Sequence, residues 1–283
     1  MKKLVALLLC ALPVLAAPPA DEKVRPEDTG SVESLEVTNV SREVASLWVR
    51  TLLPAVAKGY KQTFSGEVGL ANVGIPTKGP VTVMVQTKPG SKTSEAVFFV
   101  DVKLADVPEE LASRIGTKAL DIHFKGSLAG ENGSTARVCA VGVLRLGTSD
   151  VKAPYSFLEA FVKFGGARLT GLSLTETKGA GKVVLFNPFS FPLSVKSVAY
   201  GIEANGQKLG NGGKEAFQIH GGRESEISLP ITAPNASLVA AAGSLLRTGG
   251  TIDGLLTGAI AIKAGNGAIT IPLKMPGRID LAR

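Results

Sequence analysis

Side chains that commonly do chemistry are sparse in this chain, which has 283 residues but only two histidines and two cysteines. His123 lies in an apolar run, and His220 directly precedes Gly221-Gly222 at the end of another run. Many hydrolases place their serine in a Gly-x-Ser-x-Gly elbow, and the sequence has no such elbow. We therefore predict no catalytic residues, no metal ligands and no cofactor, and we interpret both histidines as structural or surface residues.

One glycine-rich stretch, Gly179-Ala180-Gly181-Lys182, partly matches a phosphate-binding loop. The full motif needs a glycine five residues before the Gly-Lys pair and a Ser or Thr directly after the lysine. Glu176 and Val183 occupy those two positions. We therefore interpret the stretch as a turn that joins two strands, with no role in binding phosphate.

Residues 1–16 have the pattern of a secretory signal peptide. Two lysines precede an apolar run that ends in small residues, so cleavage is expected before Ala17. The run is too short to span a bilayer, which takes about 20 residues, and no later run is long enough either. The short signal is typical of bacteria. We expect export to the periplasm, the cell envelope or the medium, with no transmembrane segment after cleavage.

Both cysteines have ordinary interpretations. Cys10 lies inside the signal behind three leucines, whereas a lipidated cysteine normally follows a small residue, so we do not expect lipoprotein anchoring. Signal removal leaves Cys139 alone in the mature chain, which predicts that no disulfide forms. Because Val138 and Val141 flank it, we interpret Cys139 as a buried thiol.

The formal net charge of +7 comes from 31 Lys and Arg against 24 Asp and Glu. Loss of the signal removes two lysines and leaves +5. The basic residues are scattered, whereas nucleic-acid binding needs a concentrated patch. Nucleic acid is therefore not an expected partner, and client proteins or an anionic envelope surface are the partners that we consider.

The elements that would position any site are mostly short strands, bounded by Gly, Pro and Asn-Gly turns. Helices are predicted at 41–57, where Pro54 ends or kinks the helix, and at 107–115 and 235–246. In 193–204 a change of alternation phase predicts a β-bulge near Ser197. The predicted strands are 81–85, 96–102, 119–127, 136–146, 167–176, 183–186, 193–204, 216–220, 226–231, 255–263 and 268–274.

The order helix, strand, Asn-Gly turn, strand occurs twice, at an offset of about 134 residues, which indicates a tandem repeat of domain size. We predict a mainly β fold, with two antiparallel β-sandwich units of immunoglobulin or fibronectin III type, each with a short helix. The expected organisation is a signal at 1–16, a flexible linker at 17–34, sandwich domains at 35–160 and 165–276, and a tail at 277–283.

The second half resembles a known family. An apolar strand leads into Asn-Pro, then Phe-Pro-Leu, then a strand that ends at glycine-rich turns; these are the marks of the late embryogenesis abundant type 2 family, also called the water stress and hypersensitive response domain. The resemblance is clearest over 169–275. The residues that carry it are Asn187, Pro188, Phe191, Pro192, Leu193, Gly206 and Gly210.

The residues of this motif favour a structural role. Pro188 has no N–H for a sheet ladder, so the strand must end there or lie at an edge. Asn187 is held extended by the following proline and bonds nearby backbone. The resemblance implies a compact sandwich with a helix, a link to desiccation and other stress, and no enzymatic activity. The first half has no such Asn-Pro corner, so its membership depends on the repeat alone.

Two functions follow from these expectations. The first is an exported, non-enzymatic protein that protects against water stress through contacts with protein or membrane surfaces. The alternative is a binding or assembly module of the cell envelope, for a lipid, a hydrophobic ligand or a protein partner. An apolar groove or a contiguous exposed apolar patch would favour the alternative.

Overall fold

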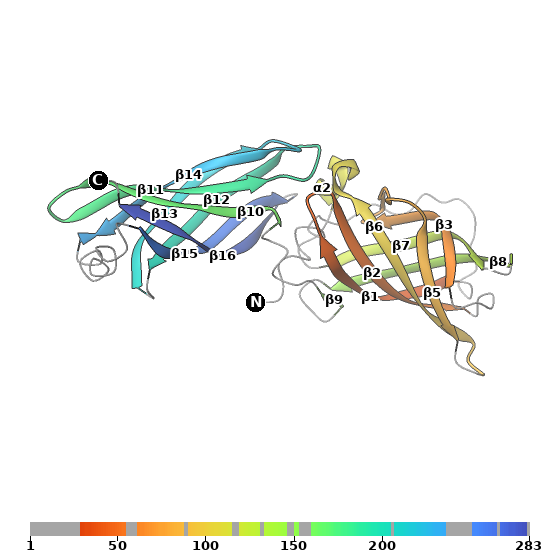
Figure 1. Cartoon of the computed structure of the whole chain (residues 1–283). Coiled ribbons are helices and arrows are strands. Elements are labelled where there is room, and N and C mark those ends of the chain that lie inside the picture. The colour runs from red at the N-terminus through yellow and green to blue at the C-terminus, as the bar shows by residue number, and fades with distance from the viewer. Residues whose placement is uncertain are drawn as a thin grey trace. The chain divides into compact units, whose positions relative to one another are not determined.

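The structure is a computed structural model that describes residues 29–54, 61–87, 90–114, 119–130, 133–145, 150–152, 160–204, 207–235, 251–264 and 267–281. The predicted signal, Gly206 and all of the predicted helix at 235–246 except Asn235 lie outside these residues. The chain forms two compact units, one within Met1–Phe157 and one that starts at Leu158 (Figure 1). We call them unit 1 and unit 2.

Unit 1 is a closed sheet. Its strands are hydrogen bonded in the order β2-β6-β5-β3-β7-β8-β1, and β1 also pairs with β2, which closes the ring. The short strand β4 extends β3, and β9 pairs with the middle of β1. The bounds are β1 (Thr29–Val40), β2 (Val44–Pro54), β3 (Lys61–Leu70), β4 (Val73–Gly74), β5 (Val81–Thr87), β6 (Thr93–Lys103), η2 (Leu104–Asp106), α2 (Glu109–Arg114), β7 (Ala119–Gly130), β8 (Thr135–Arg145) and β9 (Val151–Lys152).

Unit 2 is a closed barrel in the order β10-β11-β14-β13-β12-β15-β16, which returns to β10. The bounds are β10 (Val162–Leu172), β11 (Glu176–Phe186), β12 (Leu193–Ala204), β13 (Gln207–Ile219), β14 (Glu224–Pro234), β15 (Thr251–Ala264) and β16 (Gly267–Leu281).

The two rings have the same topology. Counted along the chain without β4 and β9, the strands of each unit run around the ring as first, second, fifth, fourth, third, sixth and seventh. In both units the first and last strands pair in parallel: β1 with β8, and β10 with β16. The last strands begin at Thr135 and Gly267, which are 132 positions apart. The tandem arrangement expected from the sequence is therefore visible in the order of the strands.

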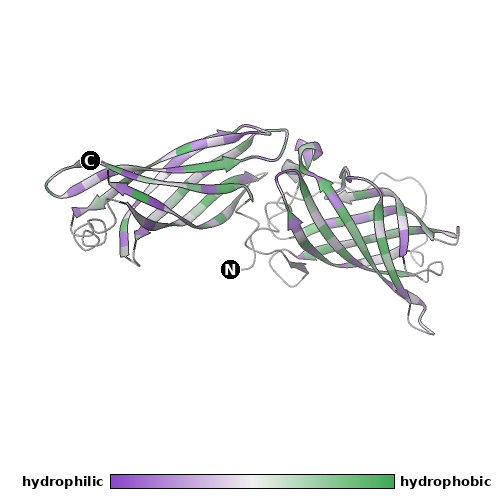
Figure 2. Ribbon diagram, viewed as in Figure 1, coloured by the Kyte–Doolittle hydropathy of each residue, from purple (hydrophilic) through white to green (hydrophobic). Residues whose placement is uncertain are grey.

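Alternation of buried and exposed residues builds both cores, as expected for strands with one face inside a barrel. Figure 2 shows the resulting bands of apolar and polar residues along the strands. In unit 1 the rings of Phe98 and Phe124 lie 4.1 Å apart, and Phe64 contacts both edge-on. In unit 2 the register of β12 against β15 slips between Val195 and Ser197, which confirms the predicted bulge.

The predicted helix at 41–57 is wrong, because its central part is strand β2. Alternate residues of β2 are buried, from Ala45 through Leu47 to Leu53, while Trp48 and Leu52 face outward. Since both faces of the strand carry apolar side chains, the sequence also fits a helical period. Pro54 is the last residue of the strand, where a missing N–H is tolerated.

Several predicted boundaries also differ. Strand β1 begins at Thr29, inside the expected linker at 17–34, and β16 continues to Leu281, inside the expected tail at 277–283. The stretch from Gly179 to Lys182 is not a turn but the middle of β11, where it pairs with both β10 and β14. Strands rich in small and polar residues are therefore longer than their apolar runs predict.

The mainly β class is confirmed. The hydrogen bonds run around closed rings instead of forming two separate sheets, so the immunoglobulin-like sandwich is not confirmed. Helix α2 lies inside the predicted 107–115, and the helix predicted for the second unit lies outside the described residues. In the part of the chain that the structure describes, no helix has the length and apolar character needed to cross a bilayer.

Candidate functional site: the Asn187 corner and the Trp48 face

The motif that carries the family resemblance forms a corner at the end of β11, and Asn187 holds this corner together. The side chain is fully buried. Its Nδ2 donates to the carbonyl oxygens of Phe191 at 2.7 Å and Ile219 at 3.2 Å, and its Oδ1 accepts from the Phe189 N–H at 3.1 Å. Its own N–H donates to the Arg223 carbonyl at 3.2 Å. One amide therefore joins β11, the following loop, the end of β13 and the approach to β14.

The other motif residues support the same corner. Pro188 is buried directly after Asn187, where its lack of an N–H ends the strand. The buried Phe191 ring stacks on Phe189 with centroids 5.1 Å apart and planes 14° apart. Pro192 is exposed and Leu193 is half-buried where β12 begins. These residues shape the backbone and present no reacting group.

A glycine pair closes the corner from the other side. A Cβ added to Gly221 would lie 2.8 Å from the Phe189 carbonyl oxygen and closer still to that of Ser190. Gly222 has a φ of 64°, which favours glycine, and its N–H donates to the Phe189 carbonyl at 2.8 Å. Gly221 is therefore required by a close backbone approach, and Gly222 is favoured by its positive φ.

A second glycine-rich feature is the seam between β13 and β14, where the backbones pair at a single position, Asn211 with Thr232. A Cβ on Gly210 would lie 2.6 Å from the Thr232 carbonyl oxygen, and a Cβ on Gly212 would collide with the Pro230 carbonyl oxygen. The predicted motif residue Gly210 thus lets β13 and β14 approach each other closely.

Side chains supply the bonds that this seam lacks. The Tyr200 hydroxyl donates to the Pro230 carbonyl oxygen, and Lys214 Nζ donates to the Ser228 carbonyl oxygen at 3.4 Å. Burial raises the pKa of Tyr200 to about 12, because the phenolate would lose its hydration. Tyr200 therefore remains a neutral donor across the physiological range.

The two histidines lie in different units. The His123 ring, on β7, covers Gly69 of β3, since a Cβ on Gly69 would lie 2.8 Å from its Nδ1. His123 Nε2 is 3.5 Å from Glu67 Oε1, and His220 is exposed at the end of β13. Among the described residues, no three His, Cys, Asp or Glu side chains are grouped to hold a metal ion.

Cys139 is not a buried thiol, as the flanking valines had suggested. It is half-buried, because it shares the outward row of β8 with Val141 and Val143, which are 48% and 62% exposed. Its neighbours Val138 and Ala140 lie on the buried side of β8, as does Leu144. Because apolar residues lie on both faces of β8, the sequence alone could not show whether the Cys139 side chain points into the barrel or outward.

The outer surface of unit 1 carries a feature that the sequence reading missed, an apolar face centred on the only tryptophan of the chain. Trp48 is 46% exposed on β2. It pairs across the strands with Phe99 of β6, and their rings meet edge-on at 5.3 Å and 73°. The next outward row contains Val97 of β6 and Met84 of β5. These outward residues form the Trp48 face: Trp48, Leu52, Met84, Val97 and Phe99.

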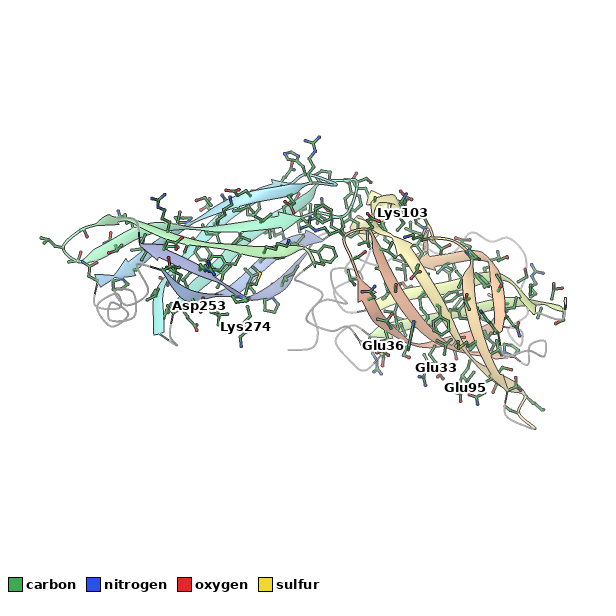
Figure 3. All side chains as sticks on the ribbon, viewed as in Figure 1. Glu33, Glu36, Glu95, Lys103, Asp253 and Lys274 are labelled. Carbon is green, nitrogen blue, oxygen red and sulfur yellow. The ribbon has the colours of Figure 1, made fainter. Side chains whose placement is uncertain are left out.

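Acidic side chains border the Trp48 face. Glu36 of β1 pairs directly with Trp48, and Glu95 of β6 pairs with Leu52. Asp101 accepts a hydrogen bond of 2.6 Å from Ser46, one row above Trp48. In Figure 3 the labelled Glu33, Glu36 and Glu95 lie along the same border of unit 1. Two basic residues share the row of Val97 and Met84: Arg50 pairs with Val97, and the exposed Lys61 of β3 pairs with Met84.

Comparison with known proteins gives a family match within unit 2. Residues 182–277 match the late embryogenesis abundant protein family. This family-matched segment contains the Asn187 corner and the seam between β13 and β14. The Trp48 face lies outside the segment. No curated protein matches the chain.

Solved structures show distant similarity only. A protein from Archaeoglobus fulgidus has 15% identity and a TM-score of 0.32, over 43% of this chain and 96% of its own. A protein from Arabidopsis thaliana has 18% identity and a TM-score of 0.38, over 44% and 83%. Red sea bream transglutaminase has 12% identity and a TM-score of 0.26, over 88% and 31%.

Proposed function

We propose that this chain is an exported, non-enzymatic protein that protects other molecules during water loss by contacts of its outer surface. The match of residues 182–277 to the late embryogenesis abundant family carries the proposal. We further propose that the segment is of the water stress and hypersensitive response type, because its motif runs through Asn187-Pro188 and Phe191-Pro192-Leu193 in that order.

The chemistry of the motif supports a role without catalysis. An active-site amide must offer hydrogen-bonding atoms to a substrate, whereas the side chain of Asn187 bonds the backbone of its own corner. Tyr200 and Lys214, two polar side chains of the seam, also bond strand carbonyls. The polar groups of the motif thus stabilise a rigid body whose outer surface is left to make contacts.

Export is proposed from the sequence of residues 1–16 and is tested separately. We expect the mature protein to begin at Ala17 and to be found in the periplasm, the cell envelope or the medium of a bacterial host. Cell fractionation with N-terminal sequencing checks both points. Export would be contradicted if the protein were found in the cytoplasm with residues 1–16 still attached. That result would leave the proposed protection untouched.

The protective role is tested by drying a labile enzyme with the purified mature chain and measuring the activity recovered after rehydration. Serum albumin at equal mass is the control for unspecific surface coverage. We expect higher recovery with the chain than with albumin, at less than an equimolar ratio of chain to enzyme. Recovery equal to that with albumin would refute protection.

The Trp48 face favours a second candidate, a binding or assembly module of the envelope, because Trp48 is exposed and the other four residues of the face are half-buried on the outer side of the sheet. Exposed contiguous apolar patches rimmed by polar residues mark interaction sites. We propose that, in this case, the partner is a protein. The two candidates are distinguished by different measurements. A binding module forms a complex with its partner in dilute solution, whereas a protective protein raises the enzyme activity recovered after drying even if no complex forms in solution.

A further inference from the structure

We propose that the Trp48 face binds an extended polypeptide segment whose apolar side chains are flanked by Lys or Arg. The inference deepens the proposed function, on which it rests, by naming the surface and the class of client. It lies in unit 1, outside the family-matched segment, and depends on the outward residues of β2, β5 and β6.

The face has the size of a short peptide. Its rows run from Glu36 through Trp48 and Phe99 to Thr82, across four strands, which spans about 14 Å at about 4.8 Å per strand. Along β2 it runs from Trp48 to Leu52, which is about 13 Å. An extended segment of four to six residues covers such an area, and a patch this small supports affinities in the micromolar to millimolar range.

The apolar side chains of the face do not stabilise the barrel interior. Alternate residues of β6 point inward, among them Phe98 and Val100, and these are buried. Val97 and Phe99 point to the opposite side together with Trp48 and Met84. An outer face that only contacts water is normally lined by polar residues, so these apolar side chains are not explained by solvation. The thioether of Met84 adds an adaptable contact of the kind found on surfaces that bind varied sequences.

Charge complementarity selects the flanks of the client. Glu33, Glu36, Glu95 and Asp101 border the face, against two basic residues, Arg50 and Lys61. Lys or Arg on either side of an apolar segment would meet these carboxylates, and complementary charges raise the rate and specificity of association. The same border repels anionic lipid, so an anionic bilayer is a poor occupant of this face.

The ring geometry argues against a glycan. Sugar rings stack flat on aromatic faces, and two coplanar neighbouring rings offer them a continuous flat platform. Trp48 and Phe99 stand at 73° to each other, which leaves a corrugated apolar surface. Leu, Val or Ile side chains fit such a surface better than a flat sugar ring.

The experiment uses the mature chain and the peptide Lys-Lys-Leu-Thr-Val-Thr-Leu-Lys-Lys. Trp48 is the only tryptophan, so its fluorescence reports binding without a label. We expect a saturable blue shift of its emission at physiological salt. Replacing the apolar residues of the peptide by Thr, or its lysines by Glu, is expected to weaken binding at least about 10-fold.

Variants of the chain assign the binding to the face. Glu33→Lys with Glu36→Lys is expected to weaken binding about 10-fold, whereas Glu215→Lys, an exposed acid of β13, is the matched control and should have no effect. For Trp48→Ser, isothermal titration replaces fluorescence, and loss of binding is expected. Val143→Ser on β8 is its control, and circular dichroism verifies that each variant keeps its β structure.

Each other outcome overturns the inference. Equal binding of the Glu-flanked peptide would exclude charge selection. A shift with chitohexaose or with phosphatidylglycerol vesicles, and none with the peptide, would assign the face to another class of partner. Self-association that Trp48→Ser abolishes, without peptide binding, would assign it to a second copy. If peptide binding fails while drying protection persists, only this inference is lost; if protection fails while the peptide binds, only the proposed function is lost.

Discussion

Removal of the Asn187 side chain is the sharpest test of the corner in unit 2. Asn187→Ala deletes three buried hydrogen bonds, to the carbonyls of Phe191 and Ile219 and from the N–H of Phe189. A buried polar group left without its partner costs about 1–3 kcal/mol. We expect the free energy of unfolding of unit 2 to fall by about 3–6 kcal/mol, which is a large part of the ~5–15 kcal/mol typical of a domain.

The assay must separate the two units. Trp48 fluorescence during urea unfolding reports unit 1, which has the only tryptophan. Pulsed hydrogen exchange with mass spectrometry follows the peptides of β11 and β13. Asn211→Ala, at an exposed position of β13, is the matched control and should change stability by less than about 0.5 kcal/mol. A loss below about 1 kcal/mol for Asn187→Ala would refute the bonding account of the corner.

Asn187→Asp adds a test by pH. The introduced carboxyl would face the carbonyl oxygens of Phe191 and Ile219 in a fully buried site. Burial and these oxygens raise its pKa above the ordinary value of about 3.9. Folding then takes up a proton, so the deficit relative to the wild type should shrink as the pH falls from 7 to 4. A deficit independent of pH would contradict the geometry.

Further outcomes follow from the seam and the corner. Tyr200→Phe leaves the Pro230 carbonyl without its donor and should destabilise unit 2 by about 1–2 kcal/mol in urea unfolding. Because the pKa of Tyr200 rises from 10.0 to about 12 on folding, the wild type should lose stability as the pH increases from 10 to 12, and Tyr200→Phe should lack this component. Gly221→Ala places a Cβ against the Ser190 carbonyl and should cost about 1–3 kcal/mol by overpacking. Gly222→Ala meets open space at a φ of 64° and should cost only about 1 kcal/mol, and thermal melts that give the reverse order would contradict the contacts described.

Strand pattern and turn chemistry were enough to predict much of unit 2. The limits of β12 are as expected from its alternation, and its bulge lies at the change of phase beside Ser197. The corner at Asn187-Pro188 follows from a proline that cannot join a ladder. What the sequence could not show is the ring closure, because the pairing of β10 with β16 joins residues that are far apart along the chain.

The missed strand and the missed surface have one cause. In β2 the outward residues Trp48 and Leu52 are apolar, as are the inward Leu47 and Val49. A strand with a solvated outer face would have alternated and been predicted correctly. The apolar outer face that we propose as a binding surface is thus what made the segment fit a helical period. Cys139 on β8 was misplaced for the same reason, since its row also carries the exposed Val141.

Parallel pairing of the first and last strands sets an order of events during synthesis. Unit 1 closes when β8 meets β1 at Thr29–Ser31, so it can fold while unit 2 is still being translated. Unit 2 closes through Ile279, Asp280 and Leu281 against β10, residues that leave the ribosome late. Its ring must therefore form from the longest-range contacts in the unit, which are slow to find. Until then one edge of β10 is unpaired, and such an edge is prone to aggregation.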